Sequence, residues 1–125
     1  MRFPGPYEAC VSVILAVLDE EARITRQLRA LACVPGLHEV VVVDGGSADR
    51  TVELARLATG VRVLSAPRGR AGQMNAGADA ATGDVLLFLH ADVALPLDAV
   101  VWTRAALLDP EVVAGGSRCV EPCRP

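Results

Sequence analysis

The chain has 125 residues, which is enough for one small domain with a buried core. Its composition is 52% apolar but only 3% aromatic, so that core has to be built from aliphatic side chains. The formal net charge of −3 argues against nucleic acid and against an anionic membrane surface as partners.

The longest apolar run, residues 9–18, is too short to cross a bilayer. It is preceded by Pro4, Pro6 and Glu8 instead of a basic patch, and three acids follow it, which is unlike a secretion signal. We therefore expect a cytoplasmic protein. Residues 1–8 are rich in Pro and Gly, so we expect a flexible lead before the domain.

Apolar runs and helical patterns alternate along the rest of the chain. Strands are predicted at residues 9–18, 38–43, 61–65 and 85–89, with a short fifth at 112–114. The first predicted helix opens with the acids at 19–21 and stops before 35–36, and the others cover 50 to about 59, 73–81 and 97–108. Ile24, Leu28 and Leu31 should form the buried stripe of the first helix. The alternation predicts an α/β fold, a Rossmann-like parallel sheet flanked by helices.

The run from Val85 to Leu89 has no polar alternation, which is typical of a strand buried on both faces in the middle of a parallel sheet. His90, Ala91 and Asp92 follow it directly. Polar segments also follow the first predicted strand, at residues 19–20, and the second, at 44–46. Because ligands bind at the carboxyl edge of open α/β sheets, these three segments predict a site.

The cysteines do not indicate a metal site. Cys10 and Cys33 fall in a strand and at a helix end, where small buried thiols are common. Cys119 and Cys123 lack the second pair of ligands that a tetrahedral zinc site needs.

Two nucleotide-binding patterns are excluded. A dinucleotide-binding domain needs glycines after its first strand, but here three carboxylates stand there and would repel phosphate. No P-loop pattern occurs either. Arg68 and Arg70, on a glycine-rich loop, can instead bind phosphate or a base edge, and Asp92 can hold a divalent cation.

Glu20 and Asp44 can accept hydrogen bonds from ribose hydroxyls or a base N–H. Each candidate also has a plainer interpretation. Glu20 would be a helix-end charge, Asp44 a turn former, Arg68 and Arg70 solvated loop residues, and Asp92 the cap of the next turn. Their convergence on one edge of the sheet favours a site.

Four segments of the chain resemble motifs of family-2 glycosyltransferases with the glycosyltransferase A-type fold. They are residues 11–24, 40–51, 68–77 and 83–92, in the order and spacing of that family. The forms at 73–75 and 89–92 look most like a bacterial selenium- or arsenosugar-associated subgroup. The resemblance implies that residues 9–116 are the donor-binding half of a nucleotide-diphospho-sugar transferase, followed by a divergent tail at 117–125.

The resemblance also implies roles for the site residues. Glu20 would contact the ribose and Asp44 the base, usually uracil. The arginine loop would position the nucleotide, and Asp92 would bind Mn²⁺ or Mg²⁺ on the diphosphate. The nucleotide-binding set is Glu20, Asp44, Gly45, Arg68, Arg70 and Asn75, and the metal-binding set is Asp92 and His90.

Three positions depart from the family pattern. Asp19 stands for the usual Asn, Ala16 for Pro, and His90 for the first acid of the Asp-x-Asp motif. The family's general base and acceptor pocket follow the matched segments, so we expect a truncated transferase with no identified catalytic base. The nearest carboxylates are Asp98, Asp109 and Glu111.

The expected function is metal-assisted, inverting transfer of a sugar from a nucleotide-diphosphate donor, with a UDP-sugar favoured, to an unknown acceptor. The alternative is a module that binds a nucleotide or nucleotide sugar without turnover. A third reading is a ligand-free relic that pairs its unfinished sheet edge with another chain. The same edge would allow a homo-oligomer.

Overall fold

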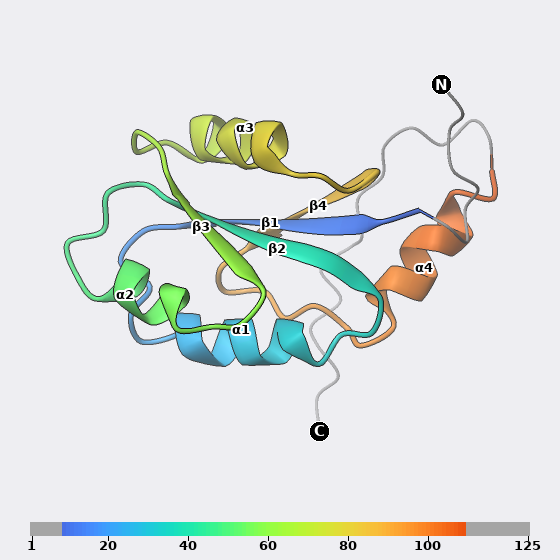
Figure 1. The fold of residues 1–125 in the computed structure, drawn as a ribbon, viewed down its shortest axis with the longest axis horizontal. Coiled ribbons are helices and arrows are strands. Elements are labelled where there is room, and N and C mark those ends of the chain that lie inside the picture. The colour runs from blue at the N-terminus through green and yellow to red at the C-terminus, as the bar shows by residue number, and fades with distance from the viewer. Residues whose placement is uncertain (1–8, 110–125) are drawn as a thin grey trace.

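The computed structural model describes residues 9–109, in which four parallel strands alternate with four helices (Figure 1). The elements are β1 (Val11–Val17), α1 (Ile24–Ala32), β2 (Leu37–Asp44), α2 (Thr51–Arg56), β3 (Val61–Ser65), α3 (Arg70–Ala80), β4 (Val85–His90) and α4 (Ala99–Ala106). The predicted α/β class and the strand–helix alternation are confirmed. The flexible lead, the fifth strand at 112–114, Glu111, Cys119, Cys123 and the domain end at 116 lie outside the described residues.

The strand order of the sheet is β3-β2-β1-β4. In register, Val17 of β1 lies beside Asp44 of β2, and Ala16 lies beside His90 of β4. The carboxyl ends of these three strands therefore reach the same edge, as the sequence predicts. The loops that follow them are brought together by the register.

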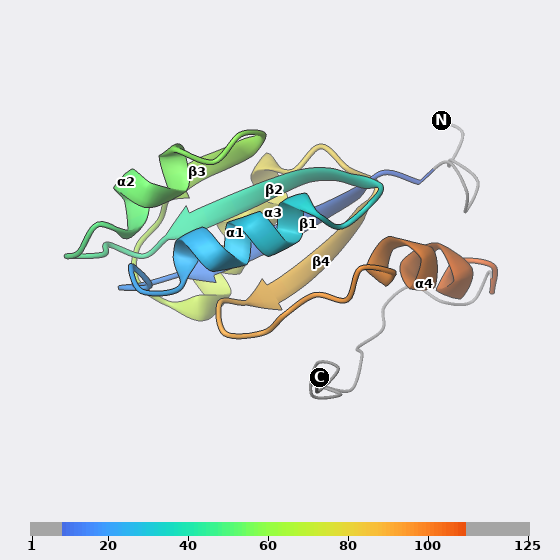
Figure 2. The ribbon, with the colours of Figure 1, turned by 90° about the horizontal axis from the view of Figure 1, so that it is seen from below.

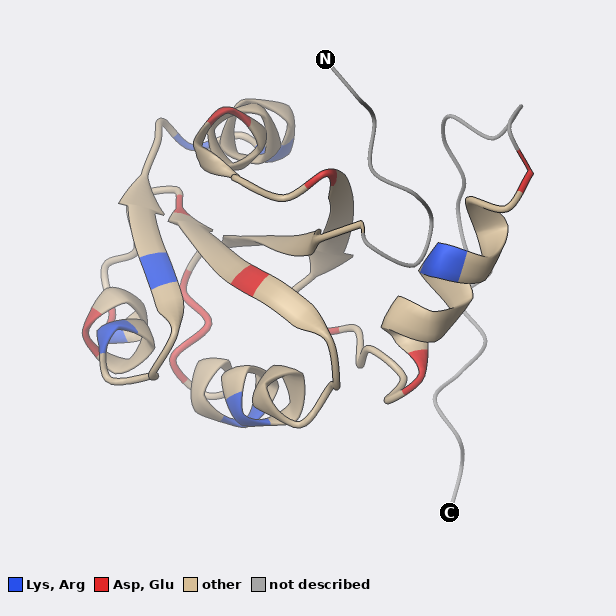
Figure 3. Cartoon of the chain, turned by 45° about the vertical axis from the view of Figure 1, so that its right-hand side comes forward, with Lys and Arg blue, Asp and Glu red and all other residues tan. Residues whose placement is uncertain are grey.

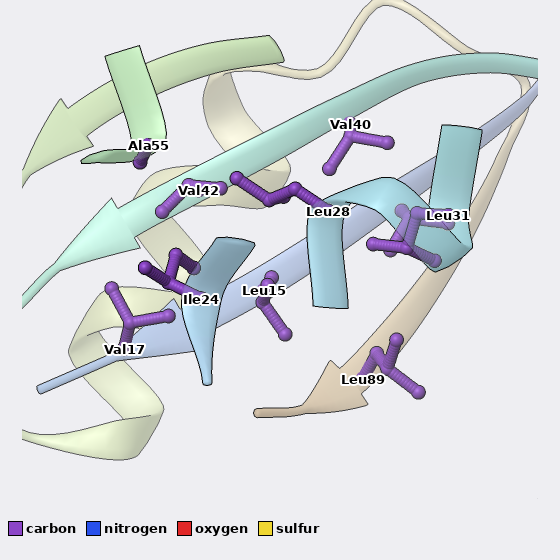
Figure 4. Close-up of a cluster of buried hydrophobic side chains, with 10 residues drawn as sticks. Leu15, Val17, Ile24, Leu28, Leu31, Val40, Val42, Ala55 and Leu89 are labelled. Carbon is purple, nitrogen blue, oxygen red and sulfur yellow. The ribbon is translucent and has the colours of Figure 1, made fainter. Parts of the chain in front are cut away.

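Helices cover the two faces of the sheet unequally. Both α1 and α2 lie on one face and α3 on the other, while α4 lies beside the amino-terminal ends of the strands (Figures 1 and 2). The main core forms between β1, β2 and α1 (Figure 4). Ile24, Leu28 and Leu31 are at most 3% exposed, which confirms the predicted stripe. Burying side chains of this size stabilises the fold by about 1.5–3 kcal/mol each.

The approach of α3 to the sheet depends on Gly77. A β-carbon at Gly77 would overlap the side chain of Ile14 and come within 3.0 Å of Val43 Cγ2. Ile14 and Val43 form a small core beneath α3. The absence of a side chain at Gly77 thus sets the distance between the helix and the two interior strands.

A polar cluster around Glu39 of β2 holds the turn that follows the carboxyl end of α3 against the sheet. Oε2 of Glu39 accepts hydrogen bonds from Ser12 Oγ at 2.7 Å and from the backbone N and Oγ1 of Thr82 at 2.5 and 3.0 Å. Oε1 accepts one from Arg62 Nη1 at 3.3 Å. Burial alone would raise the pKa of Glu39, but these donors outweigh it and lower the pKa from 4.5 to about 2.

The prediction that the strand beginning at Val85 is central was wrong. Within residues 9–109, β4 pairs only with β1 and forms an edge of the sheet. Leu89 is 6% exposed, but Phe88 is 49% exposed. Phe88 pairs with Ile14 and so lies on the face covered by α3, which packs mainly on β1 and β2. An apolar run can therefore mark an edge strand whose second face is left uncovered.

Several element boundaries also differ from the prediction. The first helix begins at Ile24 instead of the acids at 19–21, because Asp19 has a φ of 51° and cannot continue a helix. The third begins at Arg70 instead of residue 73. The second and fourth are shorter than predicted. Cys33 ends α1 and is exposed, so its predicted burial was wrong, while Cys10 is half-buried.

On α4, Val100 is buried, whereas Trp102 is 69% exposed. The Trp102 indole Nε1 donates a hydrogen bond to Asp98 Oδ2 at 2.6 Å. No helix within the described range is long and apolar enough to cross a membrane.

Candidate functional site

A cavity of about 340 Å³ opens at the carboxyl edge of the sheet. Its wall combines the end of β1 and the loop after it, the loop that leads into α3, and the end of β4. The polar residues on the wall are Glu20, Arg23, Arg68, Arg70, Gln73, His90 and Asp92. The structure thus brings together five of the predicted site residues: Glu20, Arg68, Arg70, His90 and Asp92.

The loop after β1 is held by the loop after β2. Asp19 N donates to Ser47 Oγ at 2.8 Å, and Ala48 N donates back to Asp19 Oδ1 at 2.8 Å. Asp19 adopts a left-handed backbone conformation, which Asp and Asn tolerate better than most residues. This conformation explains why Asp can stand where the family motif has Asn.

Two further backbone groups of this loop are bound by side chains at the start of α2. Glu20 N donates to Thr51 Oγ1 at 2.8 Å, and Glu21 N donates to Asp49 Oδ2 at 3.1 Å. The Thr51 hydroxyl, above all, lowers the pKa of Asp49 below its ordinary value. The backbone at Glu20 is therefore fixed, and Glu20 is one of the residues that line the cavity. Its carboxylate is 3.5 Å from Arg23 Nη1.

Asp44 is buried and is not among the residues of the cavity wall. It is 4% exposed, and its carboxylate accepts hydrogen bonds from the backbone N of Gly46 and of Ser47 and from Ser47 Oγ, at 3.0, 3.0 and 2.5 Å. These contacts are those of a turn former, the plainer of the two interpretations of Asp44. Gly45 is not on the wall either. A role for either residue in binding a nucleotide base stays a prediction.

Arg68 and Arg70 supply positive charge to the cavity. Gly69 between them has a φ of 145°, a conformation that residues with side chains rarely adopt. Both arginines are exposed, and in the described part of the chain neither forms an ion pair. Figure 3 shows basic positions in the segment that leads into α3 and acidic positions in loops that join the sheet to the helices. The guanidinium groups are free to bind an anion.

His90 is the last residue of β4, and Asp92 follows in the next turn. Both line the cavity. Within residues 9–109 no group of three or more His, Cys, Asp or Glu side chains is arranged to hold a metal ion. A cation bound here would need additional ligands from a substrate or from water.

Asn75 is exposed and is not on the cavity wall. It lies two residues beyond Gln73 on α3, which places it on nearly the opposite side of the helix. The structure does not bring it to the other candidates, and its role in nucleotide binding stays a prediction.

Sequence reasoning missed Gln73 and Arg23 as parts of the wall. Gln73 is 4% exposed and bonded to three backbone groups. The available signal was a long polar residue in an otherwise small-residue helix, one turn after the glycine loop. The Arg23 side chain is 64% exposed and lines the cavity.

Comparison with known proteins gives one family and close structural relatives. Residues 12–120 match the family model for glycosyl transferase family 2. The chain is 40% identical over 90 residues to the PGL/p-HBAD biosynthesis glycosyltransferase of Mycobacterium bovis, a match that covers 67% of this chain and 32% of that protein. The curated relatives are longer, and the matches span between 28% and 32% of their length.

Solved structures that share the fold include two sugar transferases with bound ligands. The mannosyltransferase PcManGT of Pyrobaculum calidifontis, in complex with GDP-Man and Mn²⁺, superposes with a TM-score of 0.71 at 27% identity, over 83% of this chain and 34% of that one. Glucosyl-3-phosphoglycerate synthase of Mycobacterium tuberculosis, in complex with Mn²⁺, UDP and glucosyl-3-phosphoglycerate, gives 0.64 at 27% identity, over 87% and 46%.

Proposed function

The chain belongs to glycosyl transferase family 2 and has its A-type fold, and from that premise we propose that it binds the nucleoside diphosphate of a sugar donor in the cavity at the carboxyl edge of the sheet. One observation carries the proposal. The cavity wall combines the guanidinium groups of Arg68 and Arg70, which form no ion pair within residues 9–109, with the imidazole of His90 and the carboxylate of Asp92. These are the groups that a diphosphate with its counter-cation needs.

Arg68 and Arg70 would bind phosphate oxygens. Guanidinium groups offer planar pairs of donors that match phosphate geometry, and charge-assisted hydrogen bonds are about twice as strong as neutral ones. Glu20, whose side chain is 21% exposed, would accept a hydrogen bond from a ribose hydroxyl. Asp44, Gly45 and Asn75 would need a loop or helix movement to take part.

The donor set fits a divalent cation. One imidazole and one carboxylate suit Mn²⁺ better than Mg²⁺, which prefers oxygen ligands. Two protein ligands are enough where substrate phosphates complete the coordination, as is usual for such cations. When bound, the cation offsets the negative charge that develops on the departing diphosphate. Both solved relatives described above were determined with Mn²⁺.

Sugar transfer by the whole protein is the wider proposal. A general base must reach the acceptor hydroxyl, and among residues 9–109 the cavity wall offers no carboxylates besides Glu20 and Asp92. Asp98 is bonded to Trp102 on α4, away from the wall. Nucleotide binding without turnover is therefore the second candidate function of this chain. The catalytic base stays unidentified.

Finer assignments stay proposals. We favour a UDP-sugar as donor, although one solved relative holds GDP-Man. The selenium- or arsenosugar subgroup, a cytoplasmic location and pairing of two copies through an unfinished sheet edge are predictions that follow from the sequence alone.

Calorimetric titration tests the donor site. UDP and GDP are titrated, with and without Mn²⁺, into the unaltered chain, into Asp92→Ala and into the control Asp79→Ala, which removes an exposed carboxylate of α3 that is not on the wall. We expect Mn²⁺-dependent binding that weakens at least tenfold, about 1.4 kcal/mol, only in Asp92→Ala. Failure of both nucleotides to bind the unaltered chain at millimolar concentration would refute the proposal.

A further inference from the structure

Gln73 is a buried amide at the back of the cavity, in the first turns of α3. Only 4% of its surface is exposed, although its neighbours in the loop before the helix are open to solvent. A buried amide has to be hydrogen-bonded, because an unsatisfied polar group costs about 1–3 kcal/mol. Its partners therefore indicate what it does.

The side-chain amide of Gln73 joins three separate segments of backbone. Nε2 donates to the carbonyl oxygens of Val17 and Val43, both at 2.9 Å. These carbonyls lie at the carboxyl ends of β1 and β2. Oε1 accepts a hydrogen bond from Gly69 N at 3.2 Å. One side chain thus connects the ends of the two interior strands to the arginine loop.

The hydrogen bond from Gly69 N to Gln73 Oε1 fixes the backbone between Arg68 and Arg70. Gly69 precedes α3, and its carbonyl oxygen accepts the backbone N–H of Gln73 at 2.9 Å. The two residues therefore bond each other twice, once through this first backbone bond of the helix and once through the Gln73 side chain. Because Gly69 has a φ of 145°, its orientation sets the directions in which Arg68 and Arg70 leave the backbone.

Gly45 leaves the space that the amide occupies. A β-carbon at Gly45 would lie 2.7 Å from Gln73 Oε1 and 2.8 Å from its Cδ. Gly45 N donates to the same Val17 carbonyl at 3.0 Å. The loop after β2 thus contacts the amide directly, and a side chain at Gly45 would displace it.

We propose that Gln73 is a positioning residue of the donor site, which holds Arg68 and Arg70 at a fixed place relative to the loops after β1 and β2. This inference rests on the proposed function, because the positions of the two arginines affect function only if they bind the donor diphosphate. The amide does not contact the donor. It restricts the conformations of the arginine loop before binding, so the loop loses less conformational entropy when the diphosphate binds.

The test is UDP affinity in the presence of Mn²⁺, measured by calorimetry on folded protein. Gln73→Met keeps the length of the side chain and removes all three hydrogen bonds. We expect its dissociation constant to rise about tenfold. Asp79→Asn, an exposed change on the same helix, should leave the constant unchanged.

A double-mutant cycle separates positioning from general destabilisation. In a chain that already carries Arg68→Ala and Arg70→Ala, Gln73→Met should weaken UDP binding no further, because the groups it positions are gone. An equal loss in both backgrounds would overturn the inference, and so would unchanged affinity in Gln73→Met. If the unaltered chain does not bind UDP or GDP, the proposed function fails and the inference fails with it.

A second measurement needs no variant. Hydrogen exchange of the unaltered chain should show the Gly69 amide protected, since it is bonded to a buried acceptor, while the Arg68 amide exchanges freely. A Gly69 amide that exchanges as fast as that of Arg68 would contradict the positioning role even if Gln73→Met did not fold.

Discussion

The polar cluster around Glu39 predicts that the free energy of unfolding depends on pH in a definite way. In Glu39→Gln the carboxylate that accepts four hydrogen bonds is replaced by an amide. The amide oxygen can take the place of Oε2, but the amide NH₂ then faces Arg62. A favourable charged contact becomes a contact between two donors.

The magnitude follows from the pKa of Glu39, which folding lowers from 4.5 to about 2. At about 1.4 kcal/mol for each tenfold change in proton affinity, the ionised carboxylate stabilises the folded chain by up to about 3.5 kcal/mol, and the amide of Glu39→Gln keeps part of this. The side chain is only 10% exposed, so water screens these contacts little. Because the pKa is lowered on folding, the stabilisation is complete above pH 4.5 and is lost as the pH falls from 4.5 toward 2.

The assay is urea unfolding followed by far-UV circular dichroism at pH 7, 5, 4 and 3. We expect Glu39→Gln to lower the free energy of unfolding by about 2–3 kcal/mol at pH 7, with a smaller difference from the unaltered chain at pH 3. Glu53→Gln is the control. It breaks an ion pair with Arg50 in which both side chains are more than 60% exposed, so its effect on stability should be much smaller.

Two results would refute this reasoning. The first is a difference between Glu39→Gln and the unaltered chain that stays constant from pH 7 to pH 3, since the loss would then not depend on the charge. The second is a loss at pH 7 no larger than that of Glu53→Gln.

Two other substitutions test how the loops and α3 are placed. Gly77→Ala should destabilise the fold by more than about 2 kcal/mol in the same urea assay, because the new methyl group would overlap Ile14, whereas Gly72→Ala on the same helix has open space and should cost nothing. Equal effects of the two changes would argue against close packing of α3 on the sheet. Asp19→Asn should be nearly neutral in thermal unfolding, whereas Asp19→Ala should cost about 1–2 kcal/mol, because it loses the bond from Ala48 and strains a backbone with a φ of 51°. A neutral alanine would show that this loop is not held as described.

The sequence predicted the type and order of the elements because local patterns determine them. Ile24, Leu28 and Leu31 recur at helical spacing and are all buried, and the strand at 61–65 has the predicted ends. The start of α1 was missed because the positive φ of Asp19 depends on bonds to a loop 28 residues further along the chain.

Position in the sheet could not be derived in the same way. Val85 to Leu89 carries the pattern of an interior strand, but which strands lie beside it depends on the pairing of distant segments. The candidate site was predicted better where a single strand end supplies the residue, as with His90 and Asp92. Gln73 and Glu39 were missed because each acts through partners that the sequence order does not bring together.

The position of the one tryptophan on α4 has a practical consequence for spectroscopy. Trp102 is already 69% exposed in the folded chain, so its fluorescence should change little when the chain unfolds. The same exposure makes the indole a built-in reporter for anything that comes to cover α4. A blue shift on mixing with a candidate acceptor, a second copy or another protein would register contact at that helix, without a label.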